Sequence, residues 1–165
     1  MEKDCTGLME IMGKQLGIYR SLLSLALEKQ PVLVKGNISE LERITKEEEL
    51  LILQVGRLEE QRRALHQALA NHFVLSPEEL TLTELIKRTD QEAGAKFQQL
   101  FAELGEILNE LADINLNNTD LINSSLDYIN ISLNLLTDSE KSSVYAGNHD
   151  EKKTSSAAKI FDRTV

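Results

Sequence analysis

Histidine and carboxylate side chains are the groups in this chain that could bind a metal ion or act as acids and bases. The chain contains three histidines, His66, His72 and His149. A di-iron site in a helical bundle requires a glutamate three residues before a ligand histidine. Other residue types occupy those positions, namely Arg63, Leu69 and Ala146. We therefore predict no metal site and no cofactor, and we interpret His66 and His72 as partly exposed helix positions.

The motifs of nucleophilic and nucleotide chemistry are also missing from the sequence. It contains no G-x-S-x-G elbow, no G-x-x-x-x-G-K phosphate loop and no G-x-G-x-x-G turn. The single cysteine, Cys5, cannot form an internal disulfide, and it lies near a helix end that we expect to fray. A lone cysteine favours a reducing compartment. These observations predict that the chain is not an enzyme.

Two charged residues, Glu48 and Arg62, interrupt an otherwise apolar helical stripe. One reading is a buried ion pair, but their separation is roughly 21 Å along one helix, so they cannot pair with each other. The simpler reading is that both side chains extend their charged ends past an apolar stem into water. We favour this second interpretation.

The composition favours a helical domain with a protein partner. The chain has 165 residues, of which 41% are apolar and 4% aromatic, with no tryptophan and two prolines. That length suffices for one domain with its own core. Such a mixture favours helices over sheets. The formal net charge of −9 argues against nucleic acid and against an anionic membrane surface as partners.

No part of the sequence is predicted to insert into a membrane. The first residues, Met1 to Asp4, lack the basic start and apolar core of a signal peptide. The longest apolar stretches, such as Leu22 to Leu27, are far too short to span a bilayer. We therefore predict a soluble, cytoplasmic protein.

Apolar residues at helical spacing predict three long helices. The first runs from about residue 4 to 34, with Pro31 expected to kink its last turn and Gly36-Asn37 as its stop. The second runs to about His72 and begins at Ser39, which would form a capping box with Glu42. The third runs from about residue 91 to 136.

Between the second and third helices, the sequence predicts a short connector. Ser76-Pro77-Glu78-Glu79 is a typical helix start, and the segment reaches Arg88. Three long helices with short links predict an all-α fold, an elongated up-and-down antiparallel bundle with a short connector helix. We predict a helical bundle domain over residues 1–136 and a flexible C-terminal tail over residues 137–165, which is polar and lacks a periodic apolar face.

The late half of the third helix has an unusually wide apolar face. Its rows are Leu121, Tyr128 and Leu135; Ile122, Ile129 and Leu136; and Leu126 and Leu133. A line of small polar residues, Asn118, Ser125 and Ser132, lies between the first two rows. At 100° per residue, these rows cover a wider arc than one bundle seam requires. Two explanations stay open: ordinary core packing, including packing in a homodimer, and a groove that binds an amphipathic helix of another protein.

Three ordered blocks of sequence resemble the FlgN family of flagellar type III export chaperones. The first block is Leu41 to Glu48 together with Leu58 to Arg63, and the second is Ile114 to Ile122, an N-x-x-N-x-x-L-[LI] pattern. The third is Val144-Tyr145-Ala146-Gly147, similar to the tyrosine-centred motif beyond the family's last long helix. The family usually has glycine directly after that tyrosine, where this chain has Ala146.

The resemblance implies a cytoplasmic chaperone that binds the C-terminal helical segments of the hook-associated proteins FlgK and FlgL. Such a chaperone delivers its clients to the flagellar export gate. The residues that would bind the client are Asn115, Asn118, Leu121, Ile122, Leu126, Ile129, Leu133 and Leu136. Tyr145 would dock at the export gate. The alternative function is a structural coiled-coil or bundle protein that self-associates through the third helix.

Overall fold

The computed structural model describes the backbone of residues 2–144 and the side chains of residues 2–137. The helices are α1 (Glu2–Lys35), α2 (Ile38–His72), α3 (Leu82–Arg88) and α4 (Gln91–Val144). The described residues contain no strand, so the predicted all-α fold with a short connector helix is confirmed. The described residues fall into two units that divide after Leu126, and α4 contributes to both.

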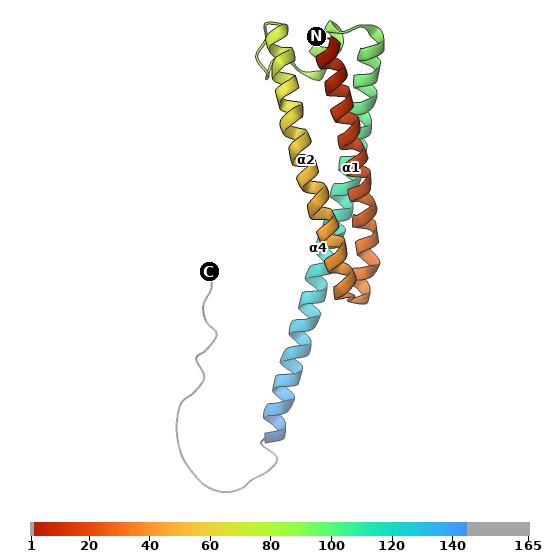
Figure 1. Ribbon diagram of the computed structural model, residues 1–165. Coiled ribbons are helices and arrows are strands. Elements are labelled where there is room, and N and C mark those ends of the chain that lie inside the picture. Colours follow the sequence, from red (N-terminus) through yellow and green to blue (C-terminus); the bar gives the residue numbers. More distant parts are fainter. Residues whose placement is uncertain (1, 145–165) are drawn as a thin grey trace. The chain divides into compact units, whose positions relative to one another are not determined.

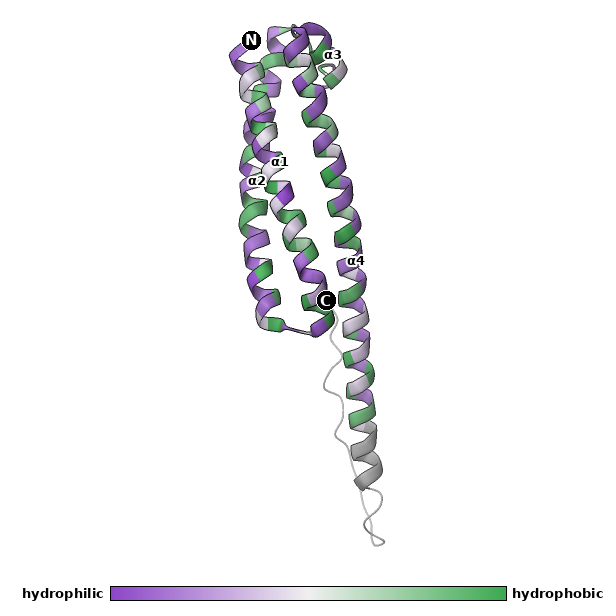
Figure 2. Cartoon of the chain, turned by 90° about the vertical axis from the view of Figure 1, so that its right-hand side faces the viewer, coloured by the Kyte–Doolittle hydropathy of each residue, from purple (hydrophilic) through white to green (hydrophobic). Residues whose placement is uncertain are grey.

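The first unit is an up-and-down bundle of α1, α2 and the first part of α4. Figure 1 shows these three segments following one another in opposite directions, with the connector and α3 at the end where α1 begins. Figure 2 shows hydrophobic and hydrophilic residues interleaved along each long helix, as expected for amphipathic bundle helices.

The apolar core is concentrated at the end of the bundle that holds α3. Side chains from all four helices and the connector meet there, namely Cys5, Leu8, Met12, Leu69, Ala70, Leu80, Leu85 and Phe97. Phe97 and Leu69 are completely buried. Cys5 is also buried in this cluster, so the expectation that it lies in a frayed end is wrong. Burial raises the pKa of the Cys5 thiol.

The link between α1 and α2 is a tight helix stop. α1 continues past Pro31 to Lys35, and Gly36 then adopts a left-handed conformation with φ of 66°. The backbone N–H of Gly36 donates to the carbonyl of Leu33, and that of Asn37 donates to the carbonyl of Val32, each over 3.2 Å. This pair of bonds is a Schellman motif, which confirms the stop predicted at Gly36-Asn37.

The N-cap of α2 is Asn37 and not the predicted Ser39. The Asn37 side-chain oxygen accepts a hydrogen bond from the backbone N–H of Glu40 over 3.3 Å. Asparagine caps a helix at least as well as serine. Because Asn37 comes first after the stop, it caps the new helix two residues earlier than the Ser39–Glu42 pair could.

The predicted helix start at Ser76 forms a reciprocal cap around a single turn. Ser76 N–H donates to the Glu79 carboxylate over 2.8 Å, and Glu79 N–H donates to the Ser76 hydroxyl over 3.3 Å. The α-helix itself begins only at Leu82, where Thr81 is the N-cap. The turn places Leu80 in the apolar core, so it fixes the connector against the bundle.

At its other end, α4 does not end at Leu136 as predicted but continues to Val144. Residues 137–144 contain neither glycine nor proline, the two residues that interrupt a helix most strongly. The Thr137 hydroxyl donates to the carbonyls of Leu133 and Asn134, which lets a polar residue continue the helix. Residues 137–144 of the predicted flexible tail are therefore helical. The rest of that tail, residues 145–165, lies outside the described residues.

Candidate partner-binding surface on α4

The C-terminal part of α4 exposes a dense set of large apolar side chains. Within residues 127–137 these are Tyr128, Ile129, Ile131, Leu133, Leu135 and Leu136, each at least half exposed. They form two rows by helical spacing, one through Ile129, Leu133 and Leu136 and one through Tyr128, Ile131 and Leu135. We call these six residues the α4 apolar rows. Ile131 was missed in the sequence analysis, although its spacing to Tyr128 and Leu135 would have revealed it.

A small serine side chain, Ser132, lies between the two rows by helical spacing. In the first unit, Ser125 occupies the equivalent position seven residues earlier, and its hydroxyl donates to the carbonyl of Leu121 over 2.9 Å. A serine hydroxyl bonded to its own helix needs no other partner. The predicted polar line therefore offers little polarity to a partner at Ser125.

In the first unit, some of the apolar side chains of α4 are exposed and others are partly buried. Ile122 and Leu126 are exposed, as is Leu116, which the sequence analysis did not include. Leu121 is half-buried. Of the predicted client-binding residues in this unit, Ile122 and Leu126 therefore present apolar surface, whereas Leu121 is shared with the bundle.

The two predicted asparagines lie in different environments. Asn118 is only 3% exposed, and its side-chain amide donates to the carbonyl of Ala26 on α1 over 2.8 Å. Its side-chain oxygen accepts no hydrogen bond from the described residues. Asn115 is exposed and borders a cavity of about 370 Å³ that α1 and α2 also line. Asn118 thus positions α4 against α1, and Asn115 alone of the two is accessible.

Polar networks occupy the middle of the bundle. Lys29 of α1 and Glu48 of α2 form an ion pair of 2.5 Å, and their side chains are only 15% and 14% exposed. The interpretation that Glu48 extends into water is therefore wrong, because its partner comes from the neighbouring helix. Burial of both members makes such a pair depend on good geometry.

Arg62 is also paired, with the carboxylate of Glu59 on the same helix. The guanidinium donates two hydrogen bonds of 2.7 Å to the two carboxylate oxygens. The side-chain amide of Gln15, which is buried in α1, donates to the same carboxylate over 3.3 Å. Hydrogen bonds from Arg62 lower the pKa of Glu59 to about 2, with smaller contributions from Arg63 and Gln15. The side chain of Arg62 is 37% exposed, so it reaches water as expected and pairs with Glu59 as well.

His66 and His72 each contact another residue of the first unit. The Nε2 atom of His66 donates to the carbonyl of Leu80 over 2.9 Å, which ties α2 to the connector. The ring of His72 packs edge-on against Phe73. Residues 2–137 contain no group of three or more histidine, cysteine, aspartate or glutamate side chains that could hold a metal ion. His149 and Tyr145 lie outside the described residues.

None of the described helices is both long enough and apolar enough to span a bilayer.

The described residues define a class of protein, a helical bundle that exposes an apolar helix face of the kind used to bind other helices. The family model described as FlgN protein matches residues 1–153, and the chain belongs to this family. Comparison with curated proteins and with solved structures gave no match.

Membership of the FlgN family makes the chain a chaperone of flagellar assembly with a general role in flagellar export. The family predicted from the three sequence blocks is thereby confirmed. FlgN is a family of chaperones and not of enzymes, and its members bind flagellar proteins.

Proposed function

We propose that this protein is a cytoplasmic chaperone that binds the C-terminal helical segments of FlgK and FlgL through the C-terminal part of α4. The observation that carries this proposal is the exposure of the α4 apolar rows. Soluble proteins rarely expose a contiguous apolar surface of this kind unless it binds a partner. Ile122 and Leu126 offer apolar side chains of the same kind within the first unit.

An amphipathic helix is the partner that fits these side chains best. Side chains at intervals of three, four and seven residues match the spacing of apolar residues on one face of a second helix. Burying each large aliphatic side chain contributes on the order of 1–2 kcal/mol, given that each is already partly covered. Loss of translational and rotational freedom offsets part of that sum, so binding can be specific and still reversible.

The proposal also includes delivery of the client to the export gate, with Tyr145 as the docking residue. Support for it comes from the resemblance of Val144-Tyr145-Ala146-Gly147 to the family motif. The helix α4 leads directly into this motif, because it ends at Val144. A docking residue next to the client-binding helix would let the gate receive chaperone and client together.

The experiment that tests client binding replaces two exposed leucines by aspartate, Leu126→Asp with Leu133→Asp. Both side chains are about half exposed, so the change is expected to leave the helix content intact. We expect affinity for C-terminal FlgK and FlgL peptides to fall by at least about a hundredfold, because two carboxylates would face an apolar helix. Calorimetric titration measures the affinity, and far-UV circular dichroism measures the helix content.

The matched control places the same charge on another face of α4. Asn130→Asp with Asn134→Asp adds two carboxylates at exposed positions outside the α4 apolar rows. We expect this variant to bind both peptides with unchanged affinity. Undiminished binding by the leucine variant would show that the client binds elsewhere.

Self-association through α4 is a second candidate function. It is favoured by the exposure of the α4 apolar rows, because the same rows of a second copy would cover them equally well. A homodimer would appear in sedimentation velocity at low micromolar concentration without any client. It would also dissociate on the same leucine substitutions, whereas a monomer that captures the peptides supports the chaperone proposal alone.

A further inference from the structure

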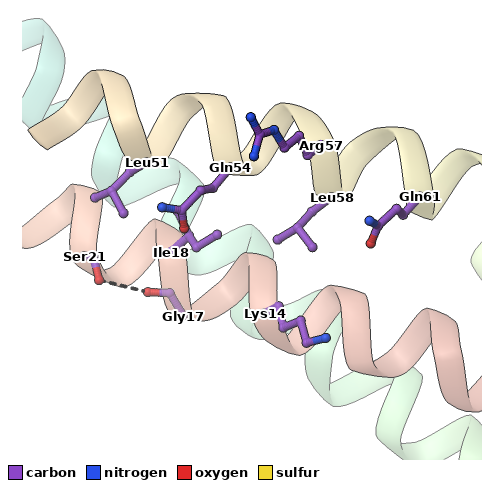
Figure 3. Close-up of a pocket in the computed structure, with 9 residues that line it drawn as sticks. All are labelled: Lys14, Gly17, Ile18, Ser21, Leu51, Gln54, Arg57, Leu58 and Gln61. Carbon is purple, nitrogen blue, oxygen red and sulfur yellow. Dashed lines mark hydrogen bonds between the residues drawn. The ribbon is translucent and has the colours of Figure 1, made fainter. Parts of the chain in front are cut away.

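A second surface, separate from α4, lies between α1 and α2 in the first unit. It is a groove of about 620 Å³ lined by residues of these two helices alone. Figure 3 shows the lining residues. On α1 it extends from Lys14 to Ser21, and on α2 from Leu51 to Gln61. At 1.5 Å per residue this is roughly 10–15 Å, or two to three turns of a bound helix.

The floor of the groove is apolar. Ile18, Leu51 and Leu58 are half-buried, and in Figure 3 they project into the space between the two helices. Gly17 widens the groove, because a Cβ atom added there would meet no atom within 4 Å. The floor therefore offers apolar contact together with room for a side chain of a partner.

The rim of the groove carries cations without carboxylate partners. Residues 2–137 contain six arginines, and all except Arg57 form ion pairs with glutamates, namely Arg20, Arg43, Arg62, Arg63 and Arg88. Lys14, on the opposite side of the groove, also forms no ion pair with the described residues. Gln54 and Gln61 complete the rim with neutral amides. No carboxylate lines the groove, so its lining carries two positive charges in a protein with a formal net charge of −9.

Apolar surface continues from the groove onto the outward face of α2. Leu50 and Leu53 are 61% and 63% exposed. Helical spacing places Leu50 on the same face as Gln54 and Arg57, at intervals of four and seven residues. A partner in the groove could therefore contact Arg57 and Leu50 at once, whereas Leu53 lies farther round α2.

We propose that the α1–α2 groove is a second docking site, for an amphipathic helix of a partner protein whose apolar stripe is flanked by acidic side chains. The stripe would cover Ile18, Leu51 and Leu58, and the carboxylates would pair with Lys14 and Arg57. Charge complementarity selects this occupant over a second copy of the chain. A twofold contact would bring the same cationic patch of each copy together, which is repulsive.

The test uses two fluorescein-labelled helical peptides of about four turns, with a leucine stripe flanked either by glutamates or by lysines. We expect the full-length protein to bind the glutamate peptide at least about tenfold more tightly in fluorescence anisotropy at low salt. Lys14→Glu with Arg57→Glu should lower that affinity by at least about tenfold and should favour the lysine peptide. Equal binding of both peptides would overturn the proposal.

Two matched controls separate the groove from net charge and from folding. Lys3→Glu with Lys35→Glu changes the net charge equally at exposed positions outside the groove, and it should bind the glutamate peptide as the unaltered protein does. Gly17→Phe should abolish binding by filling the groove, whereas Gly17→Ala should retain it. Circular dichroism checks that every variant is folded.

The α4 variant Leu126→Asp with Leu133→Asp makes this test independent of the proposed client site. It should bind the glutamate peptide with unchanged affinity even though it loses FlgK and FlgL peptides. Loss of glutamate-peptide binding in this variant would place the peptide on α4 and overturn the groove proposal. Formation of a dimer that Gly17→Phe disrupts would identify a second copy as the occupant, which would overturn it as well.

Discussion

At the scale of single residues, Glu59 makes the stability of the bundle depend on pH. Its pKa is about 2 in the folded protein, against 4.5 for an ordinary glutamate, mainly because Arg62 donates hydrogen bonds to its carboxylate. A carboxyl group with a depressed folded pKa stabilises the protein fully above its unfolded pKa. That contribution is lost as the pH falls from about 4.5 towards 2.

We therefore expect Glu59→Gln to lower the free energy of unfolding by about 1–2 kcal/mol at pH 7. Near pH 2 the same substitution should have little effect, because the glutamate is then becoming protonated. Urea unfolding at both pH values measures the difference. Glu60→Gln is the control, since Glu60 is exposed and forms no ion pair within residues 2–137, and its effect should be small at either pH.

Val74 carries backbone strain at the end of α2. Its N–H donates to Asn71 and the N–H of Leu75 donates to Ala70, so the helix ends in a second Schellman motif. Val74 occupies the left-handed position with φ of 57°, which glycine adopts readily and a β-branched residue does not. Its side chain is 91% exposed, so it gains little from packing.

Substitutions at the left-handed residues of the two Schellman motifs, Val74 and Gly36, test this strain. We expect Val74→Gly to raise the free energy of unfolding by about 0.5–1 kcal/mol, and Gly36→Val to lower it by about 1–2 kcal/mol. A Cβ atom at Gly36 would meet no other atom within 4 Å, so the loss there would come from the backbone alone. Thermal and urea unfolding measure both changes, and destabilisation by Val74→Gly would contradict the interpretation.

At the scale of the element, the start of α2 can be tested by comparing two possible caps. Asn37→Ala removes the side chain that accepts from Glu40 N–H, and we expect a loss of about 1 kcal/mol in the free energy of unfolding. Ser39→Ala should cost less than about 0.5 kcal/mol, because Ser39 lies inside the helix. A larger loss of unfolding free energy for Ser39→Ala than for Asn37→Ala would instead support the capping box predicted from the sequence.

The bodies of the helices could be predicted from the sequence, but their ends could not be placed reliably. Apolar spacing identifies a helix over many turns, so the three long helices and the connector were predicted correctly. An end depends on a choice between neighbouring caps, and Asn37 and Ser39 are both competent N-caps. The same limit applies at Leu136, where a polar sequence without glycine or proline continued as helix to Val144.

Contacts between helices were the part that sequence patterns missed. Glu48 pairs with Lys29, and Asn118 bonds to Ala26, each across a helix–helix interface. The periodicity of a single helix shows that a polar residue faces the bundle, but not which residue of another helix meets it. For the same reason Asn118, which is buried against α1, was predicted as a client contact.

At the scale of the whole molecule, capture of a client and its delivery are separate steps that we assign to different residues. We expect Tyr145→Ala to leave the affinity for FlgK and FlgL peptides unchanged, because it does not alter the α4 apolar rows. Export of the clients should fall, because the proposed docking residue at the gate is missing. Calorimetric titration measures capture, and secretion of FlgK and FlgL into the medium measures delivery.

Tyr145→Phe keeps the aromatic ring and removes only the hydroxyl, so it tests which part of the side chain the gate requires. Normal secretion by this variant would assign docking to the ring. Normal secretion by Tyr145→Ala would show that this tyrosine has no role in delivery.

The apolar cluster around Phe97 also constrains how the chain folds while it is being synthesised. The cluster joins Cys5, Leu69 and Phe97, which span more than half of the sequence. The α1–α2 hairpin consists of neighbouring segments and can form as soon as both have left the ribosome. Its apolar end must wait for the start of α4, so a nascent chain exposes that surface until roughly a hundred residues have emerged. A chaperone of this architecture therefore passes through its own stage of unprotected apolar surface before it can protect another protein.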